Sequence, residues 1–271
     1  WFLQGPATDK SVVNEIREAM VNREIIKTEI LNYHKSGRPF WTYISIQPML
    51  DHQGNLTGYF STSSDITERK LSAEALAFLS VRPSRNSEAE YFNEVAAKLG
   101  QLLHANVALV MSYVGEDRQE VFALGQWADR PEFNIPSDAI PTATCPCGPL
   151  ATAPKLIIAD DLVNVFPEDD YIQQNGFRSF AGLQLTDEAR EPIGVVGLLQ
   201  TEPMRNPELV EAILKLFAIS MSGELDRQQK AGELRQAVSM LGATLESTAD
   251  GILVVDTDQN IVRYNQQFVD L

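Results

Sequence analysis

The chain has 271 residues, 44% of them hydrophobic, and a formal net charge of −15 at pH 7. This length leaves room for about two ordinary domains, and the apolar content supports folded cores rather than disorder. The acidic balance opposes binding to a phosphate backbone, so nucleic acid is excluded as an expected partner.

The sequence predicts neither a membrane span nor a signal peptide, because it lacks a long apolar run and a basic segment at its start. We therefore expect no direct membrane contact in this segment. The two cysteines, Cys145 and Cys147, lie too close together to staple a fold. This favours a reducing cytoplasm, although the parent protein could be tethered to a membrane outside this segment.

One helix and three antiparallel strands are predicted in the first 64 residues. Asp9 can cap a helix that carries Val13, Ile16 and Met20 on one face. A three-stranded sheet alone has unpaired edges and half a core, which indicates a module truncated at its start. The three β-rich runs, separated by polar turns, are residues 25–33, 40–49 and 56–64.

Residues 60–70, Phe-Ser-Thr-Ser-Ser-Asp-Ile-Thr-Glu-Arg-Lys, join the last of these strands to a helix. Asp65 and Thr67 are both able to cap that helix. The segment resembles the one that ends PAS sensor domains and passes their output to a helical linker. The resemblance implies a PAS domain over residues 1–67 and a helical linker over residues 68–86.

Three further stretches resemble the flavin-binding LOV branch of the PAS family. They are residues 2–9 (Phe-Leu-Gln-Gly-Pro-Ala-Thr-Asp), 16–19 (Ile-Arg-Glu-Ala) and 31–41 (Leu-Asn-Tyr-His-Lys-Ser-Gly-Arg-Pro-Phe-Trp). A Gln, an Arg and an Asn at matching places in that family contact flavin mononucleotide. The resemblance therefore implies a flavin, FMN or FAD, as cofactor.

The sequence departs from the LOV pattern at three places. Thr42 replaces a second ring-binding Asn, Ser63 replaces a Gln on the last strand, and Trp1 stands where a second phosphate-binding Arg is usual. The family's photoreactive Cys would precede Trp1. Two alternatives stay open, a pocket for flavin or another small ligand, and an empty PAS core. The candidate cofactor-binding residues are Gln4, Arg17, Asn32, Thr42 and Ser63.

A second sheet is predicted after the linker. Helices are expected over residues 67–79 and 87–103, with a break at Pro83 and Ser84 and a capping box from Ser87 to Glu90. The elements that follow are a hairpin (107–114 and 120–127), a long loop (128–155), a strand (156–159), a helix (167–174) ended by Gly176, and a last hairpin (179–185 and 192–201).

This order of elements resembles a GAF domain over residues 87–226. Four motifs carry the resemblance: 158–160 (Ile-Ala-Asp), 166–169 (Phe-Pro-Glu-Asp), 179–183 (Ser-Phe-Ala-Gly-Leu) and 192–197 (Pro-Ile-Gly-Val-Val-Gly). The resemblance implies that a small-molecule ligand could bind here as well as in the PAS segment.

The Cys145-Pro-Cys147 motif lies in the long loop. Two thiolates alone do not make a zinc site, and the three histidines lie far away in sequence, so no metal is expected. Bilin attachment is one alternative, because residues 136–141 resemble the phytochrome Asp-Ile-Pro motif with an extra residue. A redox sensor is another. Buried structural thiols are the expected role.

Asn206 and Pro207 begin a predicted helix of about 40 residues. Its first half can pack on its own domain, whereas the coiled-coil segment 227–246 carries an apolar stripe with a spacing of 3 and 4 residues. We expect a parallel homodimer there. The predicted contacts are Leu234, Val238, Leu241 and Leu245.

Residues 247–271 resemble the opening of another PAS domain, with Asp-Gly at 250–251, two strands and Asn-x-x-Phe at 265–268. The whole chain is thus expected to be α+β, with PAS and GAF units joined by long signalling helices. The second PAS domain would be truncated at its C-terminal end.

The predicted function is sensory input and signal transmission in a bacterial signalling protein. We find no phosphate loop, dinucleotide fingerprint, zinc-protease motif or nucleophile elbow, so no catalytic residue is expected within the chain. By resemblance, the parent would be a histidine kinase or a diguanylate cyclase or phosphodiesterase. A ligand-free dimerisation scaffold is the alternative.

Overall fold

A computed structural model describes the chain apart from a few short gaps. The predicted break at Pro83 and Ser84, the Ser87 cap and the first residues of segment 136–141 lie outside the described part, as does Trp1. The described residues are 3–81, 88–115, 117–135, 138–248, 250–257 and 260–270.

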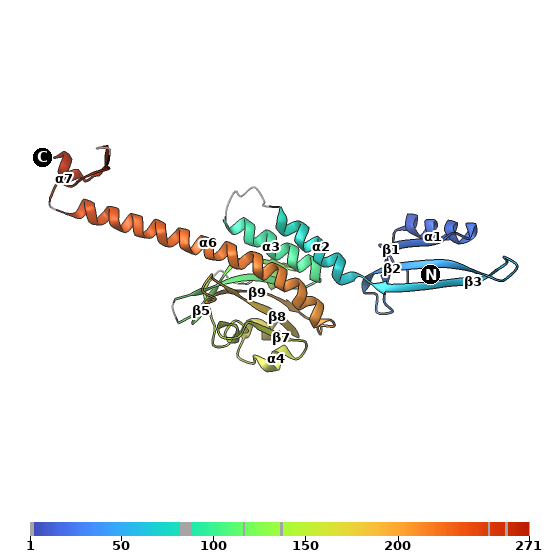
Figure 1. Ribbon diagram of the computed structural model, residues 1–271. Coiled ribbons are helices and arrows are strands. Elements are labelled where there is room, and N and C mark those ends of the chain that lie inside the picture. The colour runs from blue at the N-terminus through green and yellow to red at the C-terminus, as the bar shows by residue number, and fades with distance from the viewer. Residues whose placement is uncertain are drawn as a thin grey trace.

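The first unit is one helix against a three-stranded antiparallel sheet of order β1-β2-β3 (Figure 1). Its elements are α1 (Lys10–Asn22), β1 (Ile26–Tyr33), β2 (Pro39–Leu50) and β3 (Leu56–Asp65), so the predicted elements are confirmed. The Asp9 side chain caps α1 by accepting a hydrogen bond from the Ser11 N–H. The small core between helix and sheet contains Val13, Ile16, Ala19, Ile26 and Ile30.

At the junction after β3, only one of the two predicted capping residues acts as expected. Helix α2 (Thr67–Ser80) has Ile66 at its N-cap position, which offers no side-chain hydrogen bond. Asp65 accepts a hydrogen bond from the Thr67 N–H at 2.8 Å, as expected. The Thr67 hydroxyl instead accepts one from the Trp41 N–H at 2.9 Å, so it ties α2 to β2 rather than capping the helix.

The central unit is a six-stranded antiparallel sheet of order β6-β5-β4-β9-β8-β7. Both predicted hairpins pair as expected, β4 with β5 and β8 with β9. The strands are β4 (Val107–Val114), β5 (Glu120–Ala128), β6 (Ile140–Pro141), β7 (Lys155–Ile158), β8 (Ser179–Thr186) and β9 (Pro192–Gln200).

Helices cover one face of this sheet, and the long loop covers the other. Figure 1 shows α2, α3 (Glu88–Leu103) and α6 on the same side, away from α4 (Leu162–Val165). The helix-side core contains Phe92, Leu99, Val196 and Phe217 among its fully buried members. The loop-side core includes Phe133, Cys145, Cys147, Leu150 and Phe177.

The helix predicted over residues 167–174 is shorter in the structure. It begins at Asp170 as α5 (Asp170–Asn175), because the Asp169 carboxylate accepts a hydrogen bond from the Ile172 N–H at 3.0 Å and so marks the start. Gly176 ends it in the left-handed conformation, as predicted. The long loop contains two unpredicted 3₁₀ turns, η1 (Pro131–Phe133) and η2 (Pro149–Ala151).

Helix α6 (Pro207–Ser247) runs for 41 residues and begins as predicted, with Asn206 accepting a hydrogen bond from the Leu209 N–H at 3.2 Å. Its first half is buried against the central sheet, and its second half projects beyond it (Figure 1). A small unit of β10 (Leu253–Val255), β11 (Ile261–Tyr264) and α7 (Gln266–Val269) follows. The fold is α+β, with antiparallel sheets and flanking helices.

Candidate functional site

A polar pair lies on the α1 side of the first sheet, among apolar neighbours. Asn32 is the next-to-last residue of β1, and Thr42 lies on β2, where it pairs with Ile30. Both side chains are buried, with 6% and 2% of their surface exposed. The Asn32 side-chain N–H donates to the Thr42 hydroxyl at 3.1 Å. The strand register therefore brings together two candidate residues that lie ten positions apart in sequence.

Gln4 lies in a segment that runs along the end of β1 beside Asn32. The Leu3 carbonyl accepts a hydrogen bond from the Tyr33 N–H at 2.6 Å. The Thr8 hydroxyl donates to the Leu31 carbonyl at 2.7 Å. These contacts hold the segment with Gln4, which is half-buried, against the end of β1.

Ser63 lies on the same face of the sheet as Thr42. It pairs with Ile44 on β2, two residues beyond Thr42, and its side chain is exposed. Because side chains alternate along a strand, residues 42 and 44 of β2 share a face, and Ser63 continues that face onto β3. Ser63 can therefore contribute a hydroxyl to a ligand placed over β2 and β3.

Arg17 lies on the exposed side of α1, with its guanidinium 3.5 Å from the Asn14 side-chain oxygen. The structure therefore brings Asn32 and Thr42 into contact, places Ser63 on the same face of the sheet and Gln4 near the end of β1, and leaves Arg17 on an outer surface. An exposed guanidinium remains suited to an anionic group such as a phosphate, which stays partly in water.

Two residues of this face were not singled out from the sequence. Tyr59 donates a hydrogen bond from its hydroxyl to the Met20 carbonyl at the end of α1. Ser61 pairs with Ile46, one step along the face from Ser63. Alternation along β3 was the available signal, because positions 59, 61 and 63 share one face.

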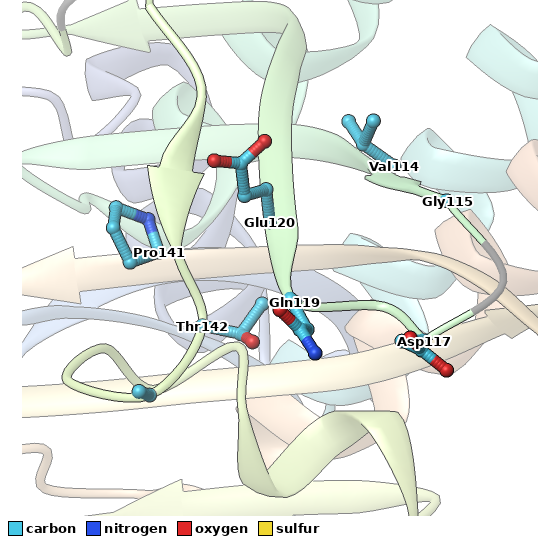
Figure 2. Close-up of a pocket in the computed structure, with 8 residues that line it drawn as sticks. Val114, Gly115, Asp117, Gln119, Glu120, Pro141 and Thr142 are labelled. Atoms are coloured by element: carbon cyan, nitrogen blue, oxygen red, sulfur yellow. The ribbon is translucent and has the colours of Figure 1, made fainter.

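A concave feature lies on the central unit, at the β4–β5 hairpin and β6 (Figure 2). Its volume is about 530 Å³. Among the described residues that line it, Asp117 and Glu120 are acidic and none is a lysine or an arginine. The remaining lining residues are Val114, Gly115, Gln119, Pro141, Thr142 and Ala143.

The first 68 residues match a family described as PAS domain. Phototropin-2 of Oryza sativa subsp. japonica is 35% identical over 106 residues, which cover 39% of this chain and 10% of that protein. A blue-light-activated histidine kinase of Rhizobium johnstonii is 42% identical over 67 residues, 25% of this chain and 19% of that protein. The N-terminal part of the chain is thus a LOV-like PAS domain related to segments of these proteins.

The solved GAF domain of an Acinetobacter phosphoenolpyruvate-protein phosphotransferase overlaps 61% of this chain and 97% of its own, at 13% identity and a TM-score of 0.48. The chain spans a tenth to a fifth of the two curated relatives above. Within the described residues, no helix has both the length and the apolar character needed to cross a membrane.

Proposed function

We propose that the chain is the sensory input and signal-transmission region of a longer bacterial signalling protein. Residues 1–67 form its LOV-like PAS domain, 68–86 a linker, 87–226 a GAF domain, 227–246 a signalling helix and 247–271 the start of a second PAS domain. The output enzyme, a histidine kinase or a diguanylate cyclase or phosphodiesterase, would lie outside this chain.

The observation that carries this proposal is a helical connection from the first sheet to the projecting half of α6. Helix α2 begins where β3 ends and lies against α6, with the rings of Phe78 and Phe217 centred 6.3 Å apart. Displacement of the first sheet would thus move α2 across α6. Small shifts of packed helices are a known means of passing a signal between domains.

Two ion pairs fasten the start of α2 to the first sheet. Lys70 and Arg69 both contact the Glu29 carboxylate on β1. Lys70, followed by Arg69, lowers the pKa of Glu29 by hydrogen bonding to its charged form. The pairing is therefore complete above the ordinary pKa of a glutamate and is lost only as the pH falls through the lowered value.

The projecting half of α6 supports a dimer. Leu234, Val238 and Leu241 are 66%, 51% and 63% exposed, and Leu245 is half-buried. The spacing places Val238 at an a position and the leucines 234 and 241 at d positions of a heptad. A β-branched residue at a with Leu at d favours two parallel strands, so the proposed partner is a second copy of this chain.

A flavin in the first PAS domain is the ligand that we propose. Asn32 and Thr42 offer an amide and a hydroxyl inside an apolar face, which suits the polar edge of a flat ring. Ser63 and Gln4 would line the same pocket, and Arg17 would meet the phosphate. A bound flavin supplies light absorption and redox chemistry, whereas these side chains bind and orient it.

Restoring the two ring-binding residues of the LOV pattern should strengthen flavin binding. We expect Thr42→Asn/Ser63→Gln to retain more FMN than the unchanged chain after reconstitution and gel filtration, because amides offer both donors and acceptors. Thr62→Asn, on the opposite face of β3, is the matched control. Retention is measured by flavin absorbance. If the unchanged chain, the double variant and the control retain equal amounts of FMN, this face does not bind the flavin ring.

The transmission step can be tested without knowing the ligand. We expect Phe78→Ala to accelerate amide exchange in the buried half of α6, because it removes the ring that packs on Phe217. Leu76→Ala is the control, since Leu76 is 54% exposed on the same helix. Unchanged exchange in α6 for Phe78→Ala would show that α2 does not act on that helix.

A ligand-free dimerisation scaffold is the second candidate. The Asn32–Thr42 hydrogen bond favours it, because the two buried polar groups partner each other without a ligand. This function predicts a dimer that retains no flavin with either Asn or Thr at position 42.

A further inference from the structure

The Cys145-Pro-Cys147 turn has features of a reactive pair rather than of two inert core thiols. Both cysteines are free, and they are 5% and 6% exposed on the loop side of the central sheet. They are the only cysteines in the chain. The expectation of buried thiols is therefore confirmed, but burial does not describe what surrounds the two sulfurs.

The Cys147 thiol lies beside the Cys145 sulfur. Hydrogen bonding from Cys147 is the largest cause that lowers the pKa of the Cys145 thiol, because it stabilises the charged form. The same contact raises the pKa of Cys147, which is also desolvated. One sulfur is thus prepared as a nucleophile and its neighbour as the proton-bearing thiol.

The turn is held tightly at both ends. The Gly148 N–H donates to the Cys145 carbonyl at 3.1 Å, and the Tyr113 hydroxyl donates to the Cys147 carbonyl at 2.8 Å. A Cβ at Gly148 would lie 2.2 Å from the Thr142 carbonyl oxygen. The turn thus passes close to Thr142, and the Cys145 thiol donates a hydrogen bond to the Thr142 carbonyl at 4.0 Å.

Thr142 connects the turn to the exposed part of the central unit. Its hydroxyl donates to the Arg118 carbonyl at 3.0 Å, and the Arg118 guanidinium pairs with Glu191 at 2.7 Å. Glu191 lies in the β8–β9 turn, where Glu188 pairs with Lys230 of α6 at 2.8 Å. The Asp187 N–H donates to the Glu191 carbonyl at 3.0 Å and closes this turn, so polar contacts and the β8–β9 turn together connect the cysteine turn to Lys230 of α6.

The hollow in Figure 2 lies next to the segment that leads into the turn. Thr142 and Ala143, which line it, come three and two residues before Cys145. Its acidic side chains disfavour large anions but do not hinder a neutral molecule such as hydrogen peroxide.

We propose that Cys145 and Cys147 form a reversible disulfide in response to a hydroperoxide, and that this switch acts on α6 through Thr142. The Cys145 thiolate attacks the peroxide oxygen, which forms a sulfenic acid and releases water after proton transfer. The Cys147 sulfur then displaces the second water and closes the S–S bond. In total, two thiols lose two electrons and two protons, and one peroxide becomes two waters.

Closing the bond shortens the contact between the sulfurs to about 2.05 Å, so the turn must tighten. The oxidised Cys145 sulfur has no proton left to donate to the Thr142 carbonyl, so the hydrogen bond to Thr142 is lost. A dithiol reductant restores the open turn. This inference concerns the central unit alone and holds whether or not the PAS domain binds flavin.

The first test uses the unchanged chain treated with hydrogen peroxide and then denatured. We expect free thiols to fall from two to none per chain, and the tryptic peptide 119–155 to lose the mass of two hydrogen atoms. Dithiothreitol should restore both thiols. Two free thiols after peroxide, or overoxidation of Cys145 beside an intact Cys147, would overturn the proposal.

Single variants assign the two roles. Cys147→Ser should accumulate a sulfenic acid at Cys145 that a dimedone probe captures, whereas Cys145→Ser should react at least about tenfold more slowly. Equal rates in the two variants would contradict the assignment. The effect on α6 is measured as amide exchange around Lys230 in the reduced and in the oxidised chain, and we expect the two rates to differ. Equal rates would refute the connection through Thr142.

Discussion

The Leu234→Asp/Leu241→Asp variant is expected to be monomeric at concentrations at which the unchanged chain is a dimer. Burial of one leucine contributes about 1.5–3 kcal/mol, and a pair of α6 helices would bury four at these positions. The substitution also places four carboxylates in one seam. We therefore expect the dissociation constant to rise by a factor of about 10⁴ or more, measured as molar mass by light scattering.

The matched control is Gln236→Asp/Ala243→Asp. These two positions have the same seven-residue spacing and are exposed, but they lie at f positions, on the outer side of a paired helix. The control adds the same charge to α6 and should leave the molar mass at the dimer value. Equal effects of the two double variants would assign the loss of dimer to charge alone.

The second large effect is expected at Gly125 on β5, where α3 lies directly against the strand. A Cβ there would lie 2.2 Å from the Phe92 backbone carbon and 2.6 Å from the Asn93 nitrogen. The helix backbone cannot yield as a flexible side chain can, so Gly125→Ala should cost about 3 kcal/mol of unfolding free energy. Chemical denaturation measures this loss.

Gly223→Ala is expected to have the opposite effect on the unfolding free energy. Gly223 is exposed on α6, and a Cβ there meets no atom within 4 Å. Alanine should therefore stabilise the helix by about 0.5–1 kcal/mol. A destabilised Gly223→Ala together with a neutral Gly125→Ala would mean that the close approach of α3 to β5 does not exist in solution.

The long periodic elements could be predicted from the sequence because local signals and packing agree. Asp9 and Asn206 cap their helices as expected, and the alternation of β1 to β3 gives the correct sheet. The short helices were harder to predict from the sequence. Helix α4 has four residues and no side-chain cap, and its Leu162 is fully buried in the loop-side core. Packing therefore determines this helix, and no local sequence signal predicts it.

In the candidate site, too, the sequence identified residues but not the contacts that depend on strand pairing. Family resemblance identified Asn32 and Thr42, but their hydrogen bond depends on the register of β1 with β2. Neither Ser61 nor the Tyr59 contact to the end of α1 could be assigned before the pairing of β3 was known. Likewise, the sequence showed the cysteine pair but not the hydrogen bond from the Cys145 thiol to the Thr142 carbonyl.

The central claim is that the projecting half of α6 pairs in parallel with a second copy and so carries the signal onward. Disulfide cross-linking tests it most directly, with Leu241→Cys in a Cys145→Ser/Cys147→Ser background and Ala243→Cys as the comparison. In a parallel pair the d position meets its own copy, so covalent dimers should form rapidly at position 241 and not at 243. Equal cross-linking at both positions, or none at 241, would contradict the claim.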